Sequence, residues 1–260
     1  MNLIKPSFEI LEQAPGIQGV KKQIELAGRT CYKSEDKITD DSCEEFVSRM
    51  VNSGHGAMLE HGTVYLYLPV DDNNFSELVE KYTKNKYTKV NQKQFITTNY
   101  RVLVENEWLD DLQYLCEPTE HHEKRVTVKF ILPISISREF IRHRTASFAE
   151  QSTRYCNYSK SKFNGELTFI KPYWYDQYKE EFESSCQYYE DTYMRAIESG
   201  LKAQEARELL PLCTKTELVM TAFISDWEHF FQLRCHSTAH PQARELAIPL
   251  KEEFINRNYI

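Results

Sequence analysis

The chain of 260 residues lacks the patterns that mark several large classes of protein. It has no apolar run near the roughly 20 residues that cross a bilayer, and its N-terminus has no charged segment followed by an apolar one. Basic residues are not in excess, because the formal net charge is −7, which disfavours a general nucleic-acid binder. We therefore expect a cytoplasmic protein that binds neither a membrane nor nucleic acid.

Metal-binding and redox spacings are also absent. None of the seven cysteines forms a C-x-x-C pair, and the histidines form no H-E-x-x-H pattern. The odd number of cysteines, without a tight framework, predicts reduced thiols, as in a cytoplasm. A zinc site needs three or four ligands at suitable spacing, so we expect no metal site.

Repeats, low-complexity tracts and Gly/Ser linkers are missing as well, which predicts a single domain over residues 1–260. Hydrophobic periodicity predicts strands over 2–12, 63–70, 124–132 and 167–170, with a hairpin turn at Asn164-Gly165, while 217–223 fits a strand or a helix. It predicts helices over 16–31, 42–50, 71–84, 99–116, 175–197, 203–209 and 226–234 (capped by Asp226), and from Pro241 onward. Because strands and helices mix without a βαβ rhythm, we expect an α+β fold with a mixed sheet and long helices.

The segment 135–155, SISREFIRHRTASFAEQSTRY, is the main candidate for a functional site. We expect it to begin as a helix directly after the strand that ends near Pro133. On a helix, successive side chains point about 100° apart, so Arg142, His143 and Arg144 fan out, and Arg138 shares a face with Arg142. Such a cluster suits a phosphate or a flat anionic ring system. The alternative is the solvated basic end of a helix.

Arg142-His143-Arg144, followed by seven residues and Ser152, resembles the signature of the flavin-dependent thymidylate synthases. Other similar segments are 27–32 (AGRTCY), 59–61 (LEH), Arg207 within ARELLPL and Arg234 within FFQLR. The chain departs from the common pattern at Cys31, Glu139, Ala149 and His229, and the segment between Val70 and Val126 is longer than in compact members.

The resemblance implies conversion of dUMP to dTMP, with 5,10-methylenetetrahydrofolate as carbon donor, NADPH as reductant and FAD as cofactor. It implies a homotetramer whose active sites lie at subunit interfaces. The residues implied to bind dUMP are Glu139, Arg142, Glu150, Gln151, Ser152, Thr153, Arg154, Arg207 and Arg234. The residues implied to bind FAD are His61, Thr63, Arg142, His143, Arg144, Glu150, Ser225 and His229. Arg207 would hold the phosphate, and Arg234 would be the catalytic group that faces the pyrimidine ring.

Other interpretations of these residues remain open. Taken alone, His61 fits a buried, hydrogen-bonded histidine, and Arg207 and Arg234 fit surface salt bridges. The aromatic stripe of the helix 175–197 fits core packing or a subunit contact. At the level of the whole chain, the alternatives are a metal-dependent nucleotide hydrolase and a nucleic-acid-binding module that uses the arginine patch.

Overall fold

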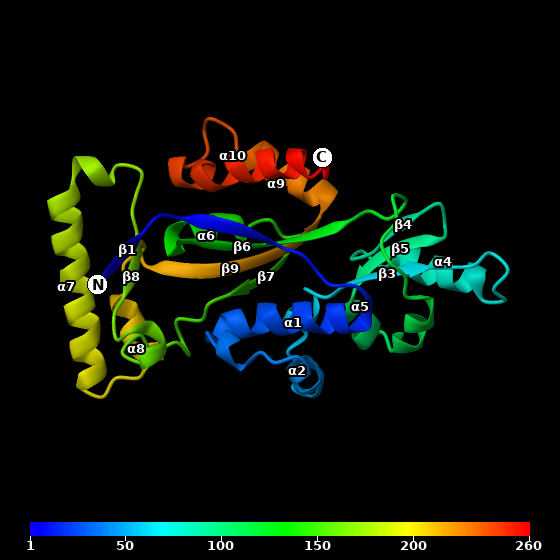
Figure 1. Ribbon diagram of the computed structural model, residues 1–260, viewed down its shortest axis with the longest axis horizontal. Helices are drawn as coiled ribbons and strands as arrows, with labels where there is room; N and C mark the ends of the chain where they lie inside the picture. Colours follow the sequence, from blue (N-terminus) through cyan, green and yellow to red (C-terminus); the bar gives the residue numbers. More distant parts are fainter.

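The computed structural model describes residues 1–260 and has a four-stranded antiparallel sheet at its centre (Figure 1). The order of its strands is β2 (Ser7–Leu11), β6 (Arg125–Pro133), β9 (Lys215–Phe223) and β7 (Ser147–Glu150). Helices α9 (Ile224–Arg234) and α10 (Pro241–Asn256) cover one face, and α1 (Gly16–Tyr32) covers the other. The strands do not alternate with helices as βαβ units, so the predicted α+β class is confirmed.

Strand β6 shows why the sheet has two different faces. Val128 and Phe130 lie on one face, in a buried cluster with Trp227 of α9 and Phe254 of α10. This confirms the alternation expected for 124–132, because apolar residues two apart point to the same side. The opposite face, toward α1, carries polar side chains such as Thr127, which is buried as well.

A second sheet lies at the end of the molecule opposite α7 (Figure 1). Its strand order is β3 (Thr63–Tyr67), β5 (Phe95–Asn99) and β4 (Lys89–Asn91). Helices α4 (Phe75–Lys84) and α5 (Tyr100–Glu105) accompany it, and their side chains join a buried cluster that includes Leu66, Tyr82 and Leu103. We call residues 63–124 the outer lobe. It contains most of the segment between Val70 and Val126, which is longer than in compact members of the resembled family.

Several predictions for the outer lobe were wrong at their boundaries. The helix predicted over 99–116 is instead the end of β5, the short helix α5 and a 3₁₀ segment, Leu109–Tyr114. Glu107 adopts a φ of 61°, which no continuous α-helix contains. Strand 63–70 ends at Tyr67, and helix 71–84 begins only at Phe75. Strands β4 and β5 were missed.

Three further expectations need correction. Helix α6 (Ile134–Phe140) ends before Arg142, so the RHR cluster lies in the turn that leads to β7 and not on a helix. Asn164-Gly165 does form a turn, with positive φ at both residues, but β8 (Thr168–Ile170) pairs in parallel with β1 (Asn2–Ile4) and not in a hairpin. Helix α9 begins at Ile224, so Asp226 lies in its first turn and is not its cap.

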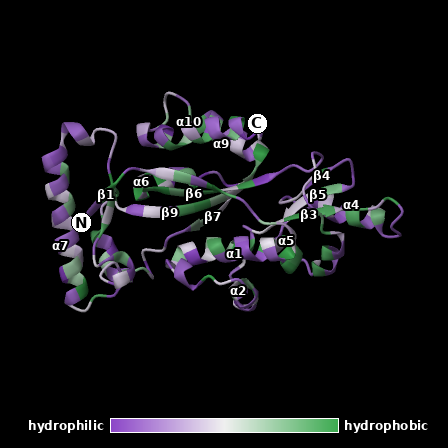
Figure 2. Cartoon of the chain, viewed as in Figure 1, coloured by the Kyte–Doolittle hydropathy of each residue, from purple (hydrophilic) through white to green (hydrophobic).

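The remaining elements are α2 (Ser42–Asn52), α3 (Gly56–Leu59), α7 (Lys179–Glu198), α8 (Ala203–Ala206) and the 3₁₀ segments Glu35–Lys37, Ser161–Phe163, Tyr175–Gln177 and Arg207–Leu209. Of these, the elements within 42–52, 175–198 and 203–209 lie close to their expected positions, whereas α3 and the 3₁₀ segments near residues 35 and 161 were not predicted. Figure 2 shows that α7 is mostly hydrophilic. Of its aromatic stripe, Tyr193 is buried, whereas Tyr178, just before the helix, and Tyr189 are exposed, so the stripe is only partly core. No helix combines the length and apolar character that a membrane span requires.

Candidate functional site

A polar cavity of about 630 Å³ gathers side chains from three separate parts of the chain. We call it the Arg207 pocket. Its walls come from α6, from the end of β7 and from the 3₁₀ segment after α8. The lining residues are Ile134, Arg138, Glu150, Gln151, Ser152, Thr153, Arg207, Glu208, Leu210 and Leu212. The structure therefore brings together five of the residues expected to bind the nucleotide.

Backbone hydrogen bonds fix the segment that follows β7. The Gln151 N–H donates to the Glu217 carbonyl at 2.8 Å, and the Ser152 N–H donates to the Cys31 carbonyl at 2.8 Å. The Ser152 hydroxyl accepts from the Arg154 N–H at 3.2 Å, an arrangement that stabilises the turn. These contacts tie the pocket to β9 and to the C-terminal end of α1, so its polar groups are held before any ligand binds.

The Arg207 pocket is lined by two arginines, Arg138 and Arg207, and by two carboxylates, Glu150 and Glu208. Burial raises the pKa of Glu150, although the hydroxyls of Ser137 and Thr216 and the charge of Arg138 lower it again. Arg207 is exposed, and its nearest ion pair is a 3.5 Å contact with Glu208, the next residue. The guanidinium thus remains available to an incoming anion.

A buried charge cluster supports the pocket from the α1 side of the sheet. Burial alone would raise the pKa of Glu217, but Lys215, Lys129 and Lys33 surround it and lower the pKa to about 2. Lys215 also donates to the Gln151 side-chain oxygen at 3.1 Å. The orientation of Gln151 therefore depends on this cluster.

Arg234 is anchored in a different place, between α9 and α6. Its Nε donates to His143 Nε2 at 3.1 Å, and its two terminal nitrogens donate to the Glu139 carboxylate at 2.9 Å and the Glu139 carbonyl at 2.6 Å. Burial, Arg234 and His229 lower the pKa of His143 to about 4, so the ring is neutral and accepts this bond. The structure thus brings together Glu139, His143, His229 and Arg234, none of which lines the Arg207 pocket.

The two arginines that flank His143 are exposed, and Arg144 lines a second cavity of about 600 Å³. We call it the Arg144 pocket. It lies between the outer lobe and β7, and its walls are Glu60, Lys86, Tyr87, Lys89, Asn99, Arg125, Arg144, Thr145, Ala146, Ser147, Phe148, Phe223 and Asp226. Ser225 lies next to Asp226, but it donates to the Glu123 carboxylate and does not line the cavity. Arg142 and Arg154 line neither pocket.

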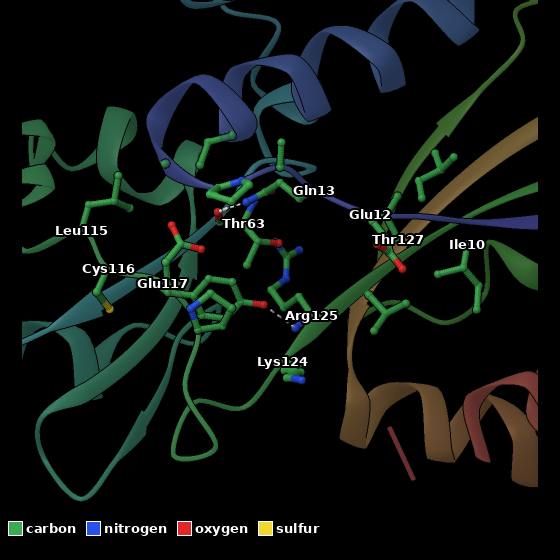
Figure 3. Close-up of a pocket in the computed structure, with 18 of the residues that line it drawn as sticks. Ile10, Glu12, Gln13, Thr63, Leu115, Cys116, Glu117, Lys124, Arg125 and Thr127 are labelled. Atoms are coloured by element: carbon green, nitrogen blue, oxygen red, sulfur yellow. Dashed lines mark hydrogen bonds between the residues drawn. The ribbon is translucent and has the colours of Figure 1, made fainter. Parts of the chain in front are cut away.

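His61 and Thr63 lie behind the Arg144 pocket and do not line it. His61 is fully buried, with Nδ1 2.8 Å from the Thr221 hydroxyl, and burial together with Arg125 lowers its pKa to about 3. The Thr63 hydroxyl accepts from Arg125 at 3.3 Å, and its backbone is held by Gln13 (Figure 3). The structure therefore agrees with the alternative in which His61 is a buried, hydrogen-bonded histidine.

Arg125 is the residue that the sequence analysis missed. Its guanidinium donates to the Glu60 carbonyl at 2.9 Å, to Thr63 and, at 3.2 Å, to the Ser147 hydroxyl, and it forms no ion pair with a carboxylate. Its only visible signal was a charge at the start of the strand RVTVKFILP. A charged residue at the start of a strand gives no indication that the outer lobe will bury its side chain.

Metal ligands do not cluster in the fold. No group of three or more His, Cys, Asp or Glu side chains is placed to hold a metal ion.

Comparison with known proteins supplies the family. The sequence model of the family described as "Thymidylate synthase complementing protein" matches residues 76–257, which is more than half of the chain. The chain is 30% identical over 118 residues to a flavin-dependent thymidylate synthase of Geobacter sulfurreducens, covering 44% of this chain and 49% of that protein. A protein of the same name from Pyrococcus furiosus is 32% identical over 127 residues, covering 48% and 51%.

Two other matches extend further along the chain at lower identity. The flavin-dependent thymidylate synthase of Corynebacterium aurimucosum is 23% identical over 227 residues, covering 86% of this chain and 72% of that protein. A crystal structure of a UMP/dUMP methylase from Streptomyces cacaoi has a TM-score of 0.48 and 18% identity, with coverage of 98% and 93%. The chain spans about half the length of the Geobacter and Pyrococcus relatives that it matches. Because the family model matches more than half of its residues, the chain belongs to the thymidylate synthase complementing protein family.

Proposed function

We propose that this chain, as one domain, is a flavin-dependent thymidylate synthase. It would convert dUMP to dTMP with FAD as cofactor, 5,10-methylenetetrahydrofolate as carbon donor and NADPH as reductant. The family match and the names of the Geobacter and Pyrococcus relatives support this proposal. The main observation in its support is the Arg207 pocket, where three separate parts of the sequence meet in one polar cavity.

The Arg207 pocket suits a nucleotide monophosphate. Its volume falls within the roughly 300–1,000 Å³ of small-molecule sites. Guanidinium groups are the preferred partners of phosphate, and both Arg138 and Arg207 border the cavity. Ser152 and Thr153 add hydroxyls, and Glu150 adds an acceptor for a sugar or ring N–H. Arg142 and Arg154 are exposed nearby in sequence and would approach the nucleotide from outside this cavity.

The Arg144 pocket suits a flavin. It combines cationic side chains with the aromatic faces of Tyr87, Phe148 and Phe223. Arg125 borders the cavity, and its buried Nε has no acceptor within the protein, so this guanidinium lacks one hydrogen bond. We propose that Arg144 contacts the flavin directly, that His61 and Thr63 act on it through Thr221 and Arg125, and that Arg142, His143, Glu150, Ser225 and His229 surround it in the assembled enzyme.

Arg234 is the proposed catalytic group. A guanidinium has five N–H donors, and the contacts to His143 and Glu139 use three of them. The two remaining donors can stabilise negative charge that develops on a pyrimidine carbonyl. The neutral His143 ring holds the guanidinium without competing for that charge. When bound, the flavin supplies the hydride, and the protein supplies orientation and electrostatics.

The separation of Arg234 from the Arg207 pocket supports assembly of the site from more than one subunit. Both arginines are proposed to contact dUMP, yet one chain holds them in different clusters. We therefore retain the homotetramer with active sites at subunit interfaces as part of the proposal. Sedimentation of the purified protein should give the mass of four chains, and a monomer that turns over dUMP would contradict the shared site.

The activity is tested with purified protein, FAD, NADPH and methylenetetrahydrofolate. We expect visible flavin absorption in the bound fraction and formation of dTMP that depends on every component. Absence of any FAD affinity in the presence of dUMP would refute the proposal. Chelator-sensitive hydrolysis of dUMP, or salt-dependent binding of nucleic acid without flavin, would favour the two alternative functions instead.

A further inference from the structure

The outer lobe supplies one wall of the Arg144 pocket. Lys86 and Tyr87 lie in the turn between α4 and β4, and Lys89 begins β4. The facing wall comes from the turn before β7 and from the end of β9. A ligand in this cavity would therefore touch both the central sheet and the lobe.

Positive charge predominates in this cavity. Four cationic residues line it, namely Lys86, Lys89, Arg125 and Arg144, against the carboxylates of Glu60 and Asp226. Glu60 is already engaged by Arg101 at 2.5 Å, outside the cavity. Lys89 has only a 3.9 Å contact with Glu123, and Lys86 and Arg144 have no ion pair at all. Lys86 and Arg144 are thus cations of this pocket that pair with no protein carboxylate.

Arg125 makes this imbalance more pronounced. Burial lowers the pKa of its guanidinium to about 10, so it stays charged at neutral pH while donating only to neutral oxygens. In Figure 3 its side chain runs from the start of β6 toward Thr63. A buried cation without a close ion pair is unfavourable, because Glu60 and Asp226 offset its charge only from a longer distance, and an anion bound in the adjacent cavity would lower that cost.

We propose that Lys86 and Lys89 of the outer lobe, together with Arg125, bind the diphosphate of FAD in the Arg144 pocket. This inference rests on the proposed flavin-dependent function and adds residues that neither the RHR motif nor its neighbours include. Lysine and arginine side chains both bind phosphate oxygens, and the aromatic side chains of the pocket offer faces for a ring of the same ligand. The outer lobe then acts as a clamp on the cofactor.

Equilibrium titration with FAD, FMN and riboflavin tests the diphosphate contact directly. Lys86→Ala should weaken FAD binding about 2- to 5-fold, as expected for an exposed charge contact, and the double variant Lys86→Ala/Lys89→Ala should weaken it further. Both should leave riboflavin binding unchanged, because riboflavin has no phosphate. The salt dependence of FAD binding should also be smaller in the double variant than in the wild type.

Lys84→Ala is the matched control. Lys84 is exposed at the end of α4, pairs with Glu80 and does not line the cavity, so its removal changes the net charge equally without touching the proposed site. This variant should bind FAD like the wild type. Thermal melts of all variants should coincide, since each altered side chain is exposed.

The outcomes separate this inference from the proposed function. A wild-type protein that binds no FAD would refute the function itself. A wild type that binds FAD, with Lys86→Ala/Lys89→Ala binding it equally well, would refute only the role of the lobe. Weaker binding of methylenetetrahydrofolate with unchanged FAD affinity would also overturn the inference, because the lysines would then serve the carboxylates of the folate.

Discussion

Replacement of Arg207 by alanine separates phosphate binding from folding. In the free protein the side chain is exposed and has only the 3.5 Å contact with Glu208. Exposed ion pairs contribute about 0.2–1 kcal/mol, so Arg207→Ala should lower the free energy of unfolding by less than about 1 kcal/mol. For a chain of this size, that corresponds to a change in Tm of at most about 2–4 °C.

The effect on dUMP binding should be much larger. A hydrogen bond to a charged group contributes about 1.5–3 kcal/mol, and about 1.4 kcal/mol is a factor of ten in Kd. The Kd for dUMP should therefore rise about 10- to 150-fold in Arg207→Ala. Because a phosphate contact acts in the ground state and the transition state alike, the turnover at saturating dUMP should change little.

Calorimetric titration with dUMP and with deoxyuridine provides the assay. Deoxyuridine lacks the phosphate, so its already weaker binding should be the same in the wild type and in Arg207→Ala. Arg195→Ala, which removes an exposed arginine of α7 that does not line the pocket, is the control and should bind dUMP normally. An unchanged Kd for dUMP, or equal weakening for dUMP and deoxyuridine, would refute the assignment of Arg207 to the phosphate.

Three other predictions address turnover, nucleophiles and pH. Arg234→Ala in the flavin-loaded enzyme should lower kcat about 100- to 1,000-fold, as the loss of one oxyanion-hole donor does in other enzymes. If kcat changed as little as in Arg207→Ala, the catalytic role of Arg234 would be contradicted. Cys156→Ser and Cys235→Ser should keep most activity, because burial raises the pKa of both thiols and only a thiolate attacks; a nucleotide adduct on either cysteine in mass spectra would say otherwise. The free energy of unfolding should fall as the pH is lowered from 6.5 to 4, by up to about 2 kcal/mol per buried histidine at pH 5. The reason is that the lowered pKa of His143 keeps its ring neutral in the folded protein, while the same histidine takes up a proton in the unfolded chain. Urea melts with the same midpoint at pH 7 and at pH 5 would exclude this effect.

The sequence predicted those elements in which one periodicity dominates. Helices α1, α7 and α10 and strand β6 have long apolar stripes, and each lies close to its expected position. Strand β5, FITTN, is short and rich in threonine and asparagine, so its backbone pairing with β3 and β4 decides its structure more than its pattern does.

Some residues of the candidate site could likewise be located from the sequence, and others could not. Residues 150–153 follow one another in the sequence, so a local motif located them, and resemblance added Arg207. No local signal could identify Arg125 or Lys86, because their proximity depends on how the outer lobe packs beside β7. The anchoring of Arg234 by Glu139 likewise joins two helices that lie far apart in the sequence.

Strand β7 borders both of the proposed ligand pockets. Ser147 at its start lines the Arg144 pocket, and Glu150 at its end lines the Arg207 pocket. Three residues of strand span about 10 Å, and positions an odd number apart point to opposite faces. Reacting groups must approach to about 3–3.5 Å, so a flavin and a nucleotide in these cavities would have to meet around the edge of β7. Because β7 is the last strand of its sheet and its outer edge has no partner strand, a neighbouring subunit placed there would enclose both ligands and exclude water.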